Sequence, residues 1–260
     1  QIKTIPANAF MLSNHNGLSA TIDSIKYNKR YNVDFIQFPS DITYQKIKYK
    51  KTSISILNYG TFYDQIDNQV FNKFDAFEID VQYSYNKKIL NKFLIVGSSG
   101  MTYSQIEDVN SLGVVSSFKI LTKIKKYNFN ISLSVNNVGF MINSYTNHSN
   151  YFPLQYQMGT LYLLPKTSVQ LGYDVIYHKN SQLYERIYCL SFPLGKLMTF
   201  RLSSHNWREK LLIDDYKNDW FYGLGYGLSI NTKKTIVDIG VSSLGSSGFI
   251  YGISVGFKKN

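Results

Sequence analysis

Histidines are the side chains best suited to acid–base chemistry near neutral pH, and this chain has four of them. They are His15, His148, His178 and His205. Their spacings match no helical or hairpin zinc motif. Only His205 could converge with acidic residues from the segment that follows it, and these are Asp214, Asp215 and Asp219. Because almost any polar loop would offer a base beside a carboxylate, we expect solvated or hydrogen-bonded histidines and no enzyme.

The other candidates for chemistry are a cysteine and a serine between glycines. Cys189 is the single cysteine, so an internal disulfide and a cysteine-based zinc site are excluded. Its strand-like neighbours "RIYCLSF" favour a packed thiol. The "LGSSG" run from 244 lacks the strand-turn-helix context of a nucleophile elbow. The sequence therefore predicts no catalytic residue, no metal ligand and no cofactor.

The composition is that of a β-rich protein with few charges. The chain has 22 Tyr and 17 Phe, only 5 Pro, and 17% charged residues, below the usual quarter. No uninterrupted apolar run reaches the roughly 18 residues of a membrane-spanning helix, but strands of about ten alternating residues could still cross a membrane. The chain begins at Gln1 instead of Met, which we interpret as a mature N-terminus after signal removal, although a trimmed chain would look the same.

Large apolar residues alternate with small or polar ones through most of the chain. In the last run, "GFIYGISVGFKKN", Phe249, Tyr251 and Phe257 share one face, and Gly252 and Gly256 share the other. This alternation predicts fourteen strands. They cover residues 31–38, 42–50, 52–60, 75–86, 92–103, 112–122, 127–138, 154–164, 168–177, 184–192, 197–205, 219–230, 235–243 and 249–257.

These strands predict an all-β fold, a transmembrane antiparallel up-and-down β-barrel of the bacterial outer membrane over residues 31–260. A sheet can cross a bilayer only when it closes, because each backbone N–H and C=O must be paired within the protein. Residues 1–30 alternate poorly and are expected to plug the lumen or lie in the periplasm. The candidate lumen-lining residues are Glu78, Asp80, Lys119, Asp174, Arg201, Asp238, Gly223, Gly225 and Gly227. They would form a structural network or line a solute path.

Short and long connections alternate along the chain, as they do between the periplasmic and external ends of such a barrel. The predicted short turns carry Lys50, Lys51, Lys87, Lys88, Lys125, Lys126, Lys166, Lys196, Lys233 and Lys234. The net charge of +11 is thus expected at one rim, as solvated turns or as a surface for anionic headgroups or an acidic partner. A nucleic acid is excluded as a partner, since lysines and aromatics would then share one patch.

The C-terminal segment "YGLGYGLSINTKKTIVDIGVSSLGSSGFIYGISVGFKK" shows a family pattern. Its elements at 227–229, 238–240 and 243–245 resemble the closing strands of the PorV/PorQ group of outer-membrane proteins, which is related to the FadL transporters. Residues 44–62, 101–120 and 133–162 show a weaker resemblance to the same group. The resemblance implies a fourteen-stranded barrel that serves in type IX secretion. The family's Ala/Gly-rich N-terminal elements and the long insertions of its cargo-handling branch are missing, which favours a PorQ-like protein or an uncharacterised paralogue.

Two functions of different classes follow. The first is a docking or scaffold component for cell-surface protein export, held in outer-membrane lipid and bound to a protein partner through aromatic residues of external loops. These loops are expected at 61–74, 139–153 and 206–218, with Phe62, Tyr145, Tyr151, Phe152 and Trp207 as contacts. The alternative is a FadL-like channel for a small hydrophobic solute, with a cavity beside the glycines at 223, 225 and 227.

Overall fold

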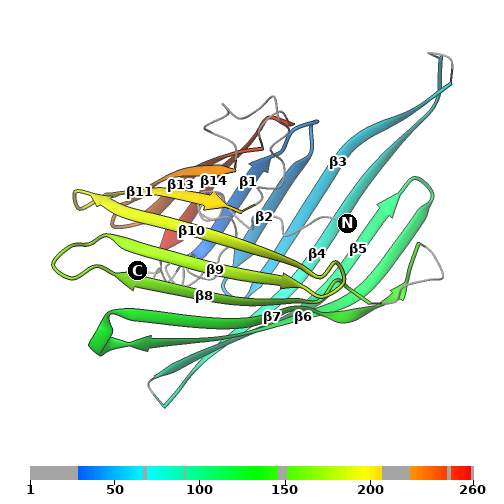
Figure 1. Cartoon of the computed structure of the whole chain (residues 1–260). Helices are drawn as coiled ribbons and strands as arrows, with labels where there is room; N and C mark the ends of the chain where they lie inside the picture. The colour runs from blue at the N-terminus through cyan, green and yellow to red at the C-terminus, as the bar shows by residue number, and fades with distance from the viewer. Residues whose placement is uncertain are drawn as a thin grey trace.

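The computed structural model describes residues 29–66, 69–90, 92–145, 151–206, 223–244 and 247–258. Within these ranges the chain forms fourteen strands and one short 3₁₀ helix, η1 (Lys125–Tyr127) (Figure 1). The strands are β1 (Lys29–Gln37), β2 (Thr43–Tyr49), β3 (Thr52–Ile66), β4 (Gln69–Ile89), β5 (Phe93–Ile106), β6 (Val109–Ile124), β7 (Phe129–Asn143), β8 (Gln155–Leu163), β9 (Gln170–His178), β10 (Leu183–Leu194), β11 (Met198–His205), β12 (Leu224–Asn231), β13 (Thr235–Ser243) and β14 (Phe249–Lys258). None of the described residues belongs to a helix long and hydrophobic enough to cross a membrane.

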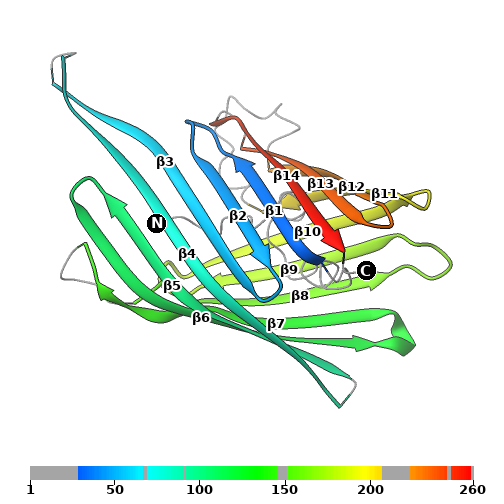
Figure 2. The same cartoon turned by 180° about the vertical axis from the view of Figure 1, so that it is seen from behind.

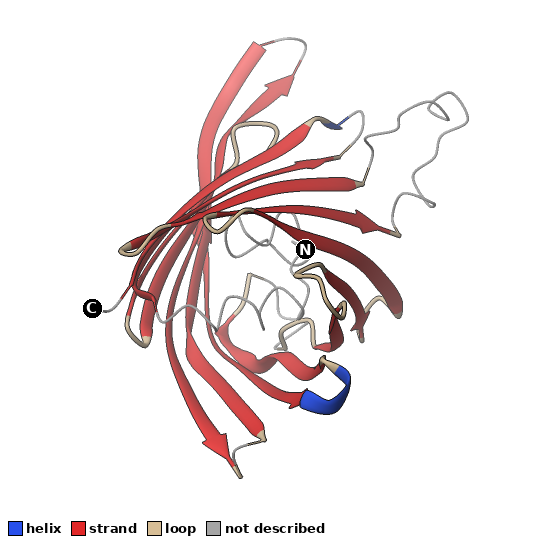
Figure 3. Cartoon of the chain, turned by 90° about the vertical axis from the view of Figure 1, so that its left-hand side faces the viewer, coloured by secondary structure: helices blue, strands red, loops and turns tan. Residues whose placement is uncertain are grey.

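The strands close into one antiparallel barrel, which confirms the predicted fold class. Each strand pairs with the next along the chain, and β1 pairs with β14 (Figure 2), which closes the wall seen in Figure 3. In β14 the residues at 249, 251, 253 and 257 are exposed on the outer face, while those at 250, 252, 254 and 256 are buried inside. The alternation seen in the sequence therefore separates the two sides of the wall. The predicted N-terminal segment lies outside the described residues, except for Lys29 and Arg30.

The barrel has two unequal halves. The long-stranded half consists of β3 to β7, whose strands have 14 to 21 residues. The short-stranded half consists of β8 to β14 with β1 and β2, whose strands have 7 to 12 residues. The β3–β4 hairpin extends beyond its neighbours (Figures 1 and 2). This corrects the loop predicted at 61–74, because all of its described residues belong to β3 or β4.

The two rims differ in their connections. We take the rim where β1 begins and β14 ends as periplasmic, since the longest connections, 144–154 and 206–223, lie at the opposite, external rim. Lys50 and Lys51 lie in a tight periplasmic turn, and their ammonium groups stand 4.9 Å from the Tyr49 and Tyr85 ring centroids, respectively. The prediction that Lys87 and Lys88 occupy a turn is wrong, because β4 continues through both residues. They pair with Ile95 and Leu94 of β5.

Candidate functional site: the inner wall of the barrel

The inner face of the short-stranded half buries three of the charged residues predicted to line the lumen. Asp174 on β9, Arg201 on β11 and Asp238 on β13 are 0%, 1% and 2% exposed. The three predicted glycines are also buried at the start of β12 and along its inner face, and they are Gly223, Gly225 and Gly227. Charges buried this deeply need compensating partners.

Arg201 and Asp238 face each other across β12. The Arg201 Nη2 atom lies 3.7 Å from Asp238 Oδ1. The Ser229 hydroxyl accepts a hydrogen bond from Arg201 Nη1 and donates one to Asp238. Gly227 is the neighbour of Arg201 in the sheet and places no side chain beside the guanidinium. This arrangement favours the structural-network alternative for these two charges over a solute path.

A second buried cluster joins three strands at their external ends. His178 Nε2 on β9 lies 2.7 Å from one carboxylate oxygen of Glu185 on β10, and His205 Nε2 on β11 lies 3.5 Å from the other. All three residues are buried on the inner face. Within the described ranges no group of three or more His, Cys, Asp or Glu side chains is arranged to hold a metal ion. This cluster was not predicted from the sequence, although the four-residue turn at 179–182 brings 178 and 185 close on one face.

The acidic residues hypothesised to meet His205 lie outside the described residues. In the structure, the carboxylate beside His205 belongs to Glu185 of the neighbouring strand. The hypothesis drew its acidic partners from the segment that follows His205, whereas antiparallel pairing of strands brings His205 to Glu185, 20 positions earlier in the chain.

The inner charges of the long-stranded half are less buried. Glu78 and Asp80 lie on β4 at the same parity as buried Ala76, and both are partly buried. The Tyr59 hydroxyl donates a hydrogen bond of 2.9 Å to Glu78. The Thr102 hydroxyl donates one of 2.5 Å to Asp80 from the adjacent strand β5. These carboxylates are therefore held by hydroxyl groups and remain partly accessible.

Three lysines face the same part of the lumen. Lys119, one of the candidate lumen-lining residues, lies on β6 at the parity of buried Leu121. Lys46 and Lys48 on β2 are near enough to Lys119 for their like charges to repel it. Lys46 is also near enough to Asp80 to attract that carboxylate. The alternation in "YQKIKYK" could have revealed them, because both lysines share the parity of buried Tyr44.

The external end of the lumen carries an apolar cluster, which we call the mouth cluster. It consists of the buried residues Ile36, Tyr44, Leu57 and Ile250, with Phe38, Ile42, Tyr59 and Leu244 packed against them. These residues come from β1, β2, β3 and β14 and from the connections at the external rim. The polar inner wall therefore gives way to a packed apolar cluster at the external end of the barrel.

Tyr145 and Phe152, two residues predicted to bind a partner, lie in the external connection 144–154 and touch the inner wall instead. The Tyr145 hydroxyl donates a hydrogen bond of 2.5 Å to the Ser104 hydroxyl, which is buried on β5. The Phe152 ring packs on Gly113 of β6 so closely that a Cβ there would come within 2.6 Å of the ring. Glycine at 113 thus makes room for an aromatic ring inside the mouth.

The other predicted partner contacts lie elsewhere. Tyr151 is 73% exposed, and Phe62 is 43% exposed on β3, where its ring stacks on Phe74 at 5.4 Å. Trp207 lies outside the described residues. The expected loop at 139–153 is in part strand, because β7 continues to Asn143.

Several solved structures have a fold similar to that of this chain. No protein-family model matches the chain. No curated protein matches it either. Solved structures do match. The CymD monoaromatic hydrocarbon channel has 9% identity and a TM-score of 0.51, over 97% of this chain and 92% of that one. The toluene transporter TbuX of Ralstonia pickettii has 8% identity and a TM-score of 0.51, over 99% and 94%.

A deltaS2 mutant of the TodX monoaromatic hydrocarbon channel also matches, with 8% identity and a TM-score of 0.52 over 88% of each chain. At these identities the likeness concerns the fold alone. The fold is that of a bacterial outer-membrane β-barrel, which confirms the predicted location. The proposed PorV/PorQ resemblance finds no support among these matches.

Proposed function

We propose that this chain forms an outer-membrane channel for a small, largely hydrophobic solute. The observation that carries this proposal is the mouth cluster, which places apolar side chains on the inside of the barrel at its external end. A porin for polar solutes has a polar, water-filled interior. An apolar mouth instead favours a solute that gains free energy by leaving water, about 25 cal/mol for each Å² of apolar surface buried.

The second wall of the mouth also fits such a solute. Phe152 lies over Gly113 on β6, across the lumen from strands that contribute to the mouth cluster. Aromatic side chains bind flat apolar rings by offset or edge-to-face packing. The fold likeness to CymD, TodX and TbuX, which are named for monoaromatic hydrocarbons or toluene, supports the same class of solute.

Two neighbouring substitutions test the proposal. Phe152→Asp puts a carboxylate into the mouth, and we expect it to remove most barrel-dependent entry of radiolabelled toluene into intact cells that carry the barrel. Tyr151→Asp adds the same charge at an exposed position and should leave entry unchanged. Heat-modifiable gel mobility verifies that both variants form the barrel. Equal uptake by Phe152→Asp and the wild-type chain would contradict the proposal.

The extended β3–β4 hairpin favours a second candidate, the docking role. This hairpin extends beyond its neighbours (Figures 1 and 2) and carries Phe62 and Tyr63, which are 43% and 55% exposed. Exposed aromatic side chains are the residues that dominate protein interfaces. If docking is the function, a partner should co-purify from the native membrane with the wild-type chain but not with Phe62→Ala/Tyr63→Ala, while toluene entry would not depend on the barrel.

A further inference from the structure

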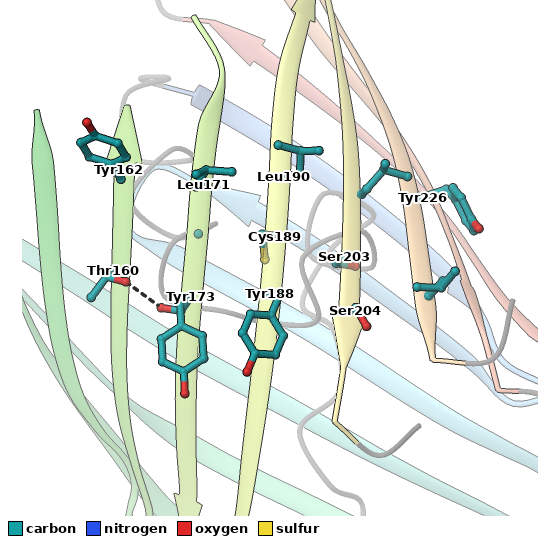
Figure 4. Close-up of a pocket in the computed structure, with 13 residues that line it drawn as sticks. Thr160, Tyr162, Leu171, Tyr173, Tyr188, Cys189, Leu190, Ser203, Ser204 and Tyr226 are labelled. Carbon is teal, nitrogen blue, oxygen red and sulfur yellow. Dashed lines mark hydrogen bonds between the residues drawn. The ribbon is translucent and has the colours of Figure 1, made fainter. Parts of the chain in front are cut away.

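The outer face of the short-stranded half carries an open, almost wholly apolar groove of about 660 Å³ over β8 to β12 (Figure 4). Three leucines that neighbour one another in the sheet form one row across it, and they are Leu171, Leu190 and Leu202. Tyr162 and Tyr226 continue this row on β8 and β12. The row lies on the parity opposite to the buried inner residues, so the groove is on the outside of the wall.

A second row, nearer the external rim, explains the hollow shape. Tyr173 and Tyr188 stand side by side with ring centroids 5.1 Å apart (Figure 4). The small residues Thr160 and Ser204 flank them on β8 and β11. The Thr160 hydroxyl donates a 3.2 Å hydrogen bond to the Tyr173 carbonyl, which satisfies its polar group at the groove surface. Large rings beside small residues leave a depression of the kind that an alkyl chain fills.

A cation stands at the external side of this groove. Arg186 is the next outer residue of β10 beyond Tyr188 and is exposed. Tyr177 and Tyr184, with ring centroids 4.7 Å apart, form the next outer row toward the external rim. Arg186 makes no ion pair with another described residue. A guanidinium facing lipid is unfavourable unless it reaches a head group or meets an anion, and the long arginine side chain allows both.

We propose that this groove binds an acyl chain of an anionic lipid of the outer leaflet, whose phosphate-bearing head group pairs with Arg186. The occupant follows from the position of the groove. Its apolar rows lie on the lipid-facing side of an outer-membrane barrel, and its cation lies toward the external rim, where outer-leaflet head groups are. The site is separated from the lumen by the wall, so the proposal is independent of the channel function.

Native mass spectrometry of the purified full chain in detergent tests the site, with phosphatidylglycerol and phosphatidylcholine of identical acyl chains as probes. We expect the wild-type chain to retain phosphatidylglycerol about fivefold better than phosphatidylcholine, because one basic side chain attracts an anionic head group by about that factor. Arg186→Gln should reduce this retention to that of phosphatidylcholine. Lys87→Gln removes an exposed outer-face cation near the opposite rim and should keep the preference.

Ser204→Phe fills the depression beside Tyr188 with a side chain that lipid tolerates, and should lower retention of both lipids severalfold. The proposal is overturned if Arg186→Gln keeps the preference or if Ser204→Phe leaves retention of both lipids unchanged. It is also overturned if the wild-type chain is a dimer that Ser204→Phe converts to a monomer at unaltered lipid retention, because a second copy then covers the groove.

Discussion

The two halves of the barrel carry their inner charges in different ways. In the short-stranded half, Asp174, Arg201 and Asp238 are at most 2% exposed, and Arg201 and Asp238 are linked through Ser229. In the long-stranded half, Glu78 and Asp80 are only partly buried and accept hydrogen bonds from neutral hydroxyl groups.

The comparison shows that inward-facing charges need not share one role. A buried ion pair contributes little net stability, but its loss leaves an uncompensated charge, so the short-stranded half depends on its pairs. A partly exposed carboxylate keeps contact with water. We therefore assign a structural role to the buried charges on β9, β11 and β13 and an adjustable role to Glu78 and Asp80 on β4.

The largest effect is expected when the pair in the short-stranded half is broken. Arg201→Met leaves Asp238 buried without its cation, which should cost about 3 to 5 kcal/mol in the free energy of unfolding. Urea unfolding of the barrel in lipid vesicles measures the change. Arg201→Met/Asp238→Leu removes both charges and should recover most of the loss. A single variant as stable as the wild type would remove the distinction between the halves.

A smaller effect is expected for a carboxylate of the long-stranded half. Asp80→Asn preserves shape and keeps an oxygen that can accept from the Thr102 hydroxyl, so we expect a loss of about 1 kcal/mol in the same unfolding assay. Asp238→Asn is the matched change in the short-stranded half and should cost clearly more. An equal loss in the free energy of unfolding for the two variants would mean that Asp80 and Asp238 are buried to the same extent.

The smallest response is expected from the native thiol. Cys189 is buried on the inner face of β10, so a water-soluble maleimide should leave it unmodified in the folded barrel. A thiol introduced by Gln82→Cys in a Cys189→Ser background faces the lumen from the long-stranded half, where the wall is only partly buried, and should react readily. Mass spectrometry of the labelled chains separates the two. Fast labelling of Cys189 would show that the short-stranded half is open.

Much of the architecture was predictable from local patterns. The fourteen strands and the face that each inner charge occupies follow from period-two alternation, because successive Cβ atoms point to opposite sides of a strand. The same rule could have identified Lys46 and Lys48. The continuation of β3 through Phe62 was less accessible, because alternation weakens near Gly60, where the register with β4 shifts.

The candidate sites depended on contacts between distant segments. The cluster of His178, Glu185 and His205 forms where three strand ends meet, and Phe152 reaches Gly113 from a connection 39 positions along the chain. No pattern in either segment alone indicates such a contact.

The sequence by itself determined that this chain is a closed sheet whose outward-facing side chains are mostly apolar and whose inward-facing side chains are mostly small or polar. Alternation is a property of each strand's own backbone, and closure is the one way to pair that backbone in lipid. The tertiary structure decided which inner charges are buried and which are partly accessible, which loop aromatics contact the lumen wall, and where the outer wall is hollow. Those features depend on the register and curvature of many strands at once and on how their connections fold back, and no single strand carries that information.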